Sequence, residues 1–143
     1  MDATVRLLGK PLKVTPFVRH HGKFEDSLND NNVAVLEYDR ATAVLTNTAL
    51  QPAASPARSF EVIGTRGTAT LQPIEPPTLS IELTEAAGPY RKGAQKVSLP
   101  DYQRYEGDFA DLAAAVRGEH ELGVSLDDEL LVAETVLRVS DMN

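Results

Sequence analysis

The three histidines are the residues of this sequence that could carry acid–base or metal chemistry near neutral pH. His20 and His21 are adjacent at the end of a predicted strand, and His120 lies in a polar loop. Consecutive side chains of a strand point to opposite faces, so His20 and His21 cannot hold one metal ion as a pair. The chain has no cysteine, which excludes disulfides, thiolate metal sites and cysteine nucleophiles. We predict no metal site and no catalytic residue in this chain.

A group of hydrogen-bond donors outside the predicted helices forms the candidate binding site. The loop at residues 89–93 combines one aromatic side chain with two cations, which suits recognition of an anion or a sugar. The alternative for each donor is a solvated surface, namely a plain strand end at residues 19–21 and a mobile loop at residues 89–93. The candidate substrate-binding residues are Arg19, His20, His21, Arg58, Tyr90 and Arg91, with Lys92 beside the last two.

Two other patterns suggest chemistry but have simpler structural explanations. Asp108 and Asp111 lie three residues apart on a predicted helix, opposite its apolar stripe, and are expected to form a solvated face. Gly64 and Gly67 enclose a turn that is followed by a strand and not by a helix. A hairpin is therefore favoured there over a phosphate-binding loop.

The composition limits the partners that this chain can have. Lys and Arg total 14 against 21 Asp and Glu, and the net charge of −7 repels a nucleic-acid backbone. No apolar run approaches the roughly 20 residues of a membrane span, and the N-terminus lacks the pattern of a signal peptide. We predict a soluble, cytoplasmic protein that binds neither nucleic acid nor membrane, although export stays compatible with the sequence.

Strand patterns occupy the first two thirds of the chain. The central one is at residues 58–72, where apolar and polar residues alternate on both sides of a short turn, and this predicts a β-hairpin. We expect a three-residue loop with Gly67 in the left-handed conformation and a bulge at Gly64. The other predicted strands lie at residues 12–18, 33–38, 42–50, 78–84 and 96–99.

The last third of the chain changes to a helical period. Apolar residues recur every three or four positions at residues 103–117 and 125–140, which predicts two helices. Ser125, followed three residues later by Asp128, caps the second helix. A short helix is predicted at residues 2–8. Strands first and helices last indicate an α+β fold, with an open, predominantly antiparallel β-sheet and helices covering one face.

Three stretches together resemble the C-terminal domain of the Gfo/Idh/MocA family of NAD(P)-dependent oxidoreductases. RSFEVIGTRGT at residues 58–68 is similar to the family's R-x-E-V-x-G-T-x-G-x-L hairpin. DFADLAAAVRG at residues 108–118, followed by the helix at 125–140, is similar to its closing helix pair. MDATVRLLGKP at residues 1–11 looks like the segment just after its D-x-G-x-H-x-x-D motif, with Asp2 in place of the final aspartate.

The resemblance implies the substrate-binding and oligomerisation domain of an enzyme that oxidises sugars, inositols or related polyols. It assigns residues 1–143 to one domain, in which 1–9 end a linking helix, 10–100 form the sheet and 103–140 the two helices. The family binds NAD or NADP on an N-terminal Rossmann domain, and neither its glycine-rich turn nor its E-K-P lysine has a match here. We therefore expect this dinucleotide-binding domain to be missing, and the chain alone to bind no dinucleotide and be inactive.

The resemblance also implies partners. These are a small sugar or polyol substrate, the missing Rossmann domain, and further copies of the chain in a homodimer or tetramer formed through the sheet face. The alternative is a stand-alone, non-catalytic binding or assembly module. The sequence selects neither the substrate nor NAD over NADP.

Overall fold

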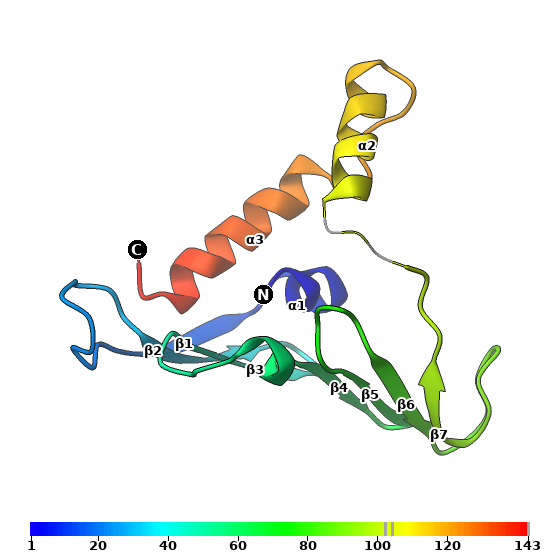
Figure 1. The fold of residues 1–143 in the computed structure, drawn as a ribbon, viewed down its shortest axis with the longest axis horizontal. Coiled ribbons are helices and arrows are strands. Elements are labelled where there is room, and N and C mark those ends of the chain that lie inside the picture. Colours follow the sequence, from blue (N-terminus) through cyan, green and yellow to red (C-terminus); the bar gives the residue numbers. More distant parts are fainter. Residues whose placement is uncertain (102, 104, 143) are drawn as a thin grey trace. The chain divides into compact units, whose positions relative to one another are not determined.

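The computed structural model describes residues 1–101, 103 and 105–142, and it confirms the predicted antiparallel α+β fold (Figure 1). Residue 104, within the predicted helical region 103–140, lies outside the described residues. None of the described helices is long and apolar enough to cross a membrane. The elements are α1 (Asp2–Leu8), β1 (Lys13–Arg19), β2 (Asn31–Glu37), β3 (Thr42–Thr48), the 3₁₀ turn η1 (Ser55–Ala57), β4 (Phe60–Gly64), β5 (Gly67–Leu71), β6 (Leu79–Leu83), β7 (Gly93–Val97), α2 (Glu106–Val116) and α3 (Leu126–Val139).

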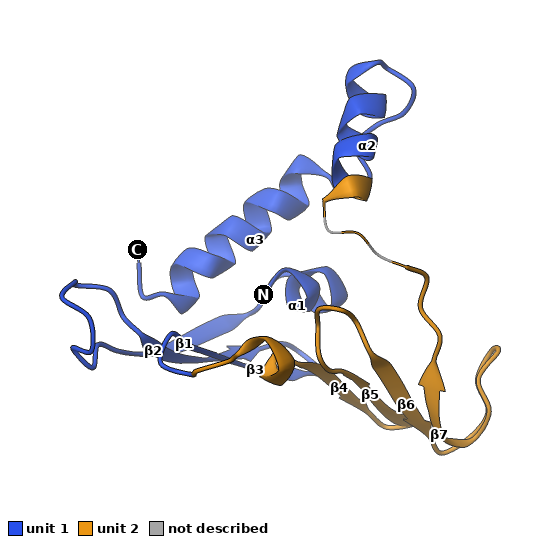
Figure 2. Ribbon diagram, viewed as in Figure 1, with its two compact units in different colours: residues 1–51, 108–143 blue, residues 52–107 orange. Residues whose placement is uncertain are grey.

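The strands form two antiparallel sheets, where the sequence suggested one. The first has the order β1-β2-β3 and the second the order β4-β5-β6-β7. The chain correspondingly divides into unit 1, residues 1–51 and 108–143, and unit 2, residues 52–107 (Figure 2). The connection from β3 to β4 contains Pro52 and Pro56, which have no N–H to donate to a sheet ladder. This connection explains why the strand pairing stops at β3.

Unit 1 has a small core on the helix-covered face of its sheet. The side chains of Ala34 and Leu36 point to this face from β2 and are 3% and 0% exposed. Helix α3 packs on β1, and α1 packs on α3. Thr135 of α3 is buried in this layer, and its hydroxyl donates to the Leu131 carbonyl at 2.8 Å. Burial of these aliphatic side chains is the main stabilising contribution in unit 1.

The helix ends of unit 1 follow from local sequence. Ser125 is the N-cap of α3, as predicted, because its hydroxyl oxygen accepts the Asp128 N–H at 3.1 Å. Arg6 of α1 donates to Asp2 on the same helix at 2.7 Å and to Glu129 of α3 at 2.8 Å. Both ion pairs are exposed, so each adds little to the stability of the fold. The Arg6–Glu129 pair orients α1 against α3.

The predicted central hairpin is present in unit 2, but its turn is shorter than expected. Gly64 pairs directly with Gly67, so the loop has two residues, Thr65 and Arg66, and Gly64 forms no bulge. A Cβ atom at position 67 would lie 2.2 Å from the Glu82 carbonyl oxygen of β6. Glycine is therefore required at position 67 by the close approach of the next strand as well as by its φ of 157°.

One strand boundary also differs from the sequence prediction. Strand β7 runs over Gly93–Val97 instead of residues 96–99, because Gly93 pairs with Leu83 and extends the ladder into the predicted loop.

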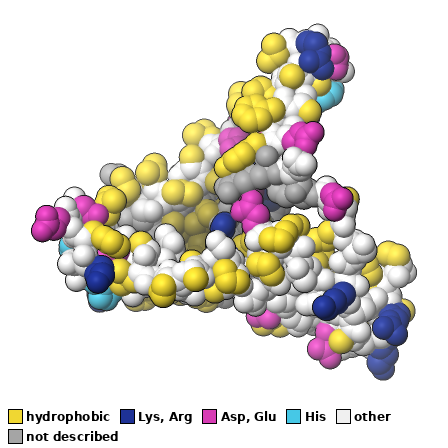
Figure 3. Space-filling view, viewed as in Figure 1, with side chains coloured by type: hydrophobic (Ala, Val, Ile, Leu, Met, Phe, Trp, Pro, Cys, Tyr) yellow, Lys and Arg dark blue, Asp and Glu magenta, His cyan; other side chains and the backbone are white. Residues whose placement is uncertain are grey.

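Helix α2 keeps its apolar stripe largely exposed. Its Phe109, Leu112 and Val116 are 68%, 46% and 79% exposed, and Figure 3 shows hydrophobic side chains at the surface along α2. Within the described residues, α3 and α1 cover the first sheet.

Candidate functional site

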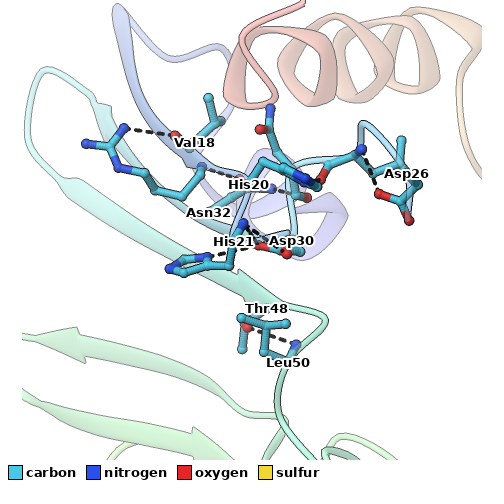
Figure 4. Close-up of polar contacts among 11 residues, drawn as sticks. Val18, His20, His21, Asp26, Asp30, Asn32, Thr48 and Leu50 are labelled. Carbon is cyan, nitrogen blue, oxygen red and sulfur yellow. Dashed lines mark hydrogen bonds and ion pairs between the residues drawn. The ribbon is translucent and has the colours of Figure 1, made fainter. Parts of the chain in front are cut away.

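A polar cluster joins His21 to Asp30 at one end of the first sheet (Figure 4). Both carboxylate oxygens of Asp30 lie within hydrogen-bond distance of the His21 backbone N–H, at 3.0 and 3.1 Å. The Nδ1 atom of the His21 ring lies 3.0 Å from Asp30 Oδ1. The Asp30 side chain is 6% exposed, whereas that of His21 is 48% exposed. Asp30 is thus a nearly buried carboxylate that fixes the position of a half-exposed imidazole.

Asp30 is also bound through its backbone to both neighbouring strands. Its N–H donates to the Arg19 carbonyl at the end of β1, at 2.9 Å. Its carbonyl accepts the Ala49 N–H just after β3, at 2.8 Å. Asp30 therefore ties the ends of β1, β2 and β3 together, and it holds His21, which lies in the connection after β1, at this end of the sheet.

The ionisation of Asp30 depends on two opposing effects. Removal of the carboxyl group from water raises its pKa, while hydrogen bonds from the side chain and backbone of His21 lower it, and the second effect prevails. The pKa of Asp30 therefore lies below its ordinary value, and the group is a carboxylate at neutral pH.

Arg19 and His20 have their own local contacts. The Nη1 of Arg19 donates to the Val18 carbonyl at 3.0 Å, and Nδ1 of His20 lies 2.6 Å from the Leu28 carbonyl oxygen (Figure 4). Strand β1 ends at Arg19, so His20 and His21 lie beyond it. The prediction that these two histidines lie on a strand is therefore wrong, and the argument that their side chains point to opposite faces of it does not apply.

A hollow of about 520 Å³ lies beside His21. Four of its six lining residues come from the connection after β1, including the exposed Phe24, and the other two follow β3. Leu50 is held there by its N–H, which donates to the Thr48 hydroxyl at 3.1 Å (Figure 4). The lining residues are His21, Gly22, Lys23, Phe24, Ala49 and Leu50.

The remaining predicted site residues lie in unit 2. Nη1 of Arg58 is 3.7 Å from Glu75 Oε2 in an ion pair. Tyr90 forms an isolated bridge with Ala87, and the backbone N–H of Arg91 donates to the Gln95 side chain at 3.3 Å. The structure thus brings Arg19, His20 and His21 to one end of the first sheet, and it places Arg58, Tyr90, Arg91 and Lys92 in the other unit.

Sequence reasoning missed Asp30, because residues 23–32 are rich in acidic residues and asparagine, a composition typical of a loop. The signal that could have identified it is its place directly before the apolar run of β2, where a side chain can reach the neighbouring strand end. The expected solvated face at Asp111 is also more structured than predicted. Its carboxylate accepts the Gly123 N–H at 3.1 Å and lies 3.6 Å from Nε2 of His120, which closes the α2–α3 connection.

A second polar surface lies on one face of the second sheet. Residues of all four strands align across it in register, and they alternate with an apolar opposite face. The Thr70 hydroxyl donates to the Glu61 carboxylate at 3.3 Å. An open hollow of about 580 Å³ lies on this face. The aligned row is Glu61, Thr70, Ser80 and Lys96.

The described residues fit neither a metal ion nor a dinucleotide. They contain no cluster of three or more His, Cys, Asp or Glu side chains that could hold a metal. A dinucleotide-binding fold places a glycine-rich turn between a strand and a helix. Only β7 is followed directly by a helix among the described elements, and residues 98–105 of that connection contain no glycine.

Comparison with known proteins finds the same fold in solved structures. No protein-family model and no curated protein matches the sequence. yvaA of Bacillus subtilis, named as an oxidoreductase, superposes with a TM-score of 0.71 over 98% of this chain at 15% identity. UDP-N-acetylglucosamine 3-dehydrogenase GnnA of Acidithiobacillus ferrooxidans gives 0.69 over 97% at 18% identity. A protein of Klebsiella pneumoniae, also named as an oxidoreductase, gives 0.69 over 98% at 17% identity.

The match covers nearly all of this chain but less than half of each larger protein. The shares of those three chains are 45%, 43% and 44%. At these identities the similarity establishes a shared fold, which agrees with the fold class expected from the sequence.

Proposed function

We propose that this chain is the substrate-binding and oligomerisation domain of a nicotinamide-dependent oxidoreductase that acts on sugars, inositols or related polyols. The observation that carries the proposal is the shared fold over 97–98% of the chain with proteins named as oxidoreductases, one of them a sugar-nucleotide dehydrogenase. The sequence resemblance to the Gfo/Idh/MocA C-terminal domain supports it independently.

In this proposal NAD or NADP binds outside these 143 residues. The chain has no glycine-rich turn that could receive a pyrophosphate at a helix N-terminus. What these residues contribute is the recognition of the substrate, because they present arginine, histidine and tyrosine side chains that can donate to hydroxyl oxygens.

The substrate-binding residues in this proposal are those expected from the sequence. Arg19 and His21 are exposed polar side chains at the end of the first sheet. Arg19 is held by its place in the β1–β2 ladder, and His21 is held by its hydrogen bonds to Asp30. Arg58, Tyr90 and Arg91, the other residues of this set, lie in unit 2. The full set is Arg19, His20, His21, Arg58, Tyr90 and Arg91.

Steady-state kinetics of the whole enzyme test this assignment. We expect Arg19→Ala and His21→Ala to change turnover or the substrate KM while leaving dinucleotide affinity unchanged, since the cofactor binds elsewhere. His120→Ala is the matched control, because it removes an exposed imidazole from the α2–α3 connection. Unchanged kinetics in both site variants would make residues 19–21 a plain solvated strand end.

The oligomerisation role concerns the face of the first sheet opposite α3. Phe17 and Val44 lie on this face and are 54% and 63% exposed, with Val33 and Val35 between them in the cross-strand register. An apolar sheet face that no helix of its own unit covers favours a partner. We propose that a second copy of the chain packs here.

Light scattering tests this contact. We expect a dimer or tetramer for the wild type and a smaller species for Val44→Lys, because a charge in an apolar interface is costly to desolvate. Val116→Lys makes the same change at an exposed valine of α2 and should leave the mass unchanged. A wild-type monomer at high concentration would rule out the contact.

The reading frame upstream of Met1 distinguishes this proposal from a stand-alone binding or assembly module. We expect it to encode a strand, a glycine-rich turn and a helix, followed by the lysine motif of the family. An upstream sequence without a dinucleotide-binding pattern would favour the stand-alone module.

A further inference from the structure

The Asp30–His21 contact determines where the proton of a neutral His21 ring lies. An ionised carboxylate only accepts hydrogen bonds, so the Nδ1 atom, 3.0 Å from Asp30 Oδ1, must be the donor. A neutral imidazole carries one N–H. With that proton on Nδ1, the Nε2 atom carries a free lone pair and acts as a hydrogen-bond acceptor.

This acceptor is available to a ligand. The His21 side chain is 48% exposed, and no residue in the described part of the chain makes a hydrogen bond to its Nε2. Its ring is one wall of the hollow of about 520 Å³. A neutral acceptor with a fixed orientation is what a ligand hydroxyl requires, because the hydroxyl can donate to it without reorganising the site.

The rest of the hollow suits a single sugar or polyol ring. Its volume lies within the range of about 300–1,000 Å³ that small-molecule sites occupy. Lys23 offers donors to ring hydroxyl oxygens, while Phe24 and Leu50 offer apolar surface to the C–H face of the ring. Glu25 and Asp26 in the same connection offset the charge of Lys23, which favours a neutral ligand over an anion.

We propose that Nε2 of His21, oriented by Asp30, accepts a hydrogen bond from a hydroxyl group of a sugar or polyol bound in this hollow. The ligand class in this inference rests on the proposed function, whereas the orientation of the ring rests on the geometry of Asp30 and His21.

His120 provides an internal comparison. Its Nδ1 lies 2.6 Å from the Glu121 carbonyl oxygen, but its Nε2 lies 3.6 Å from the Asp111 carboxylate. Both nitrogens of His120 thus face an acceptor, and His120 is not among the residues that line the hollow. His120 should therefore not respond to a ligand of the hollow.

Long-range proton–nitrogen NMR spectra of the imidazole rings test the inference on this chain. We expect the neutral His21 ring to carry its proton on Nδ1. We expect its Nε2 resonance to move when myo-inositol or glucose is added and to stay in place with permethylated inositol, which has no hydroxyl donor. The His120 resonances should stay in place throughout.

Asp30→Asn replaces a carboxylate, which only accepts hydrogen bonds, by an amide, which can also donate to Nδ1. Part of the neutral His21 population should then move its proton to Nε2, and the response to polyols should fall. If this variant does not fold, the wild-type spectra decide alone. A proton on Nε2 in the wild type, no response to either polyol, or an equal response to the permethylated compound would each overturn the inference. None of these measurements involves a dinucleotide, so their failure is distinct from failure of the proposed function.

Discussion

The two sheets have similar strand patterns but bury their apolar faces to different extents. In unit 1, Ala34 and Leu36 are almost fully enclosed beneath α3. In unit 2, no described residue is buried to that degree, although one face of the sheet is apolar apart from its glycines and Gln95, which pairs with Ile81. That half-buried face consists of Phe60, Val62, Ala69, Leu71, Leu79, Ile81, Leu83 and Val97.

The difference shows that an alternating strand pattern specifies which face is apolar and not whether that face becomes a core. Unit 1 acquires a core because α1 and α3 supply a second layer. Unit 2 relies on strand register and on tight turns, as at Gly67. We therefore expect side-chain volume to matter most in unit 1 and backbone geometry to matter most in unit 2.

The largest effect is expected in the core of unit 1. Leu36→Ala should lower the free energy of unfolding by about 2–5 kcal/mol, because it loses buried surface and leaves a cavity. Val116→Ala at an exposed position of α2 in the same unit is the control and should stay within about 0.5 kcal/mol. Denaturant unfolding followed by circular dichroism measures both. Equal losses would mean that α3 does not enclose a core.

The next effect tests the backbone of unit 2. Gly67→Ala should cost more than about 1 kcal/mol, because the new Cβ atom would collide with the Glu82 carbonyl. Gly64→Ala, across the same turn, is the matched control, since its Cβ would lie an ordinary 3.6 Å from the nearest atom. If both variants unfold at the same denaturant concentration, β5 and β6 do not approach each other closely enough to exclude a Cβ atom at position 67.

A smaller effect, of opposite sign, is expected in unit 1. The hydroxyl of Tyr38 is buried without a hydrogen-bond partner among the described residues, and its burial raises the pKa of the phenol. Tyr38→Phe removes this unpaired group and should raise the free energy of unfolding by about 1 kcal/mol. A clear loss of stability in the same unfolding assay would show that the hydroxyl has a partner.

The smallest expected effect is a change of stability with pH, which occurs only in the acid range. The pKa of Asp30 is lowered in the folded chain, so its contribution to stability is present above the ordinary aspartate pKa of about 3.9 and is lost as the pH falls through the folded value. Unfolding free energies of the wild type and Asp30→Asn should converge as the medium becomes more acidic. A constant difference down to the lowest pH would exclude Asp30 as the titrating group.

Local patterns were sufficient to predict several elements. The Ser125 cap and the β4–β5 hairpin depend on residues at most a few positions apart, so the sequence alone identifies them. The predicted turn length was wrong because Gly64 pairs with Gly67 in the ladder and forms no bulge, which leaves a two-residue loop.

The candidate site could be predicted only in part, for the same reason. His21 was identified by its chemistry, but its partner Asp30 was not, because their contact depends on the β1–β2 register that places Arg19 opposite Asn31. That register is set by tertiary pairing and is not visible in the local sequence around either residue.

The central claim is that these residues form the substrate side of an oxidoreductase whose dinucleotide binds elsewhere. Isothermal titration calorimetry of the 143-residue chain with NAD(H) and NADP(H) tests it most directly. We expect no saturable heat with any of the four nucleotides, because no glycine-rich turn leads from a strand into a helix among the described elements. A micromolar dissociation constant for any of them would contradict it.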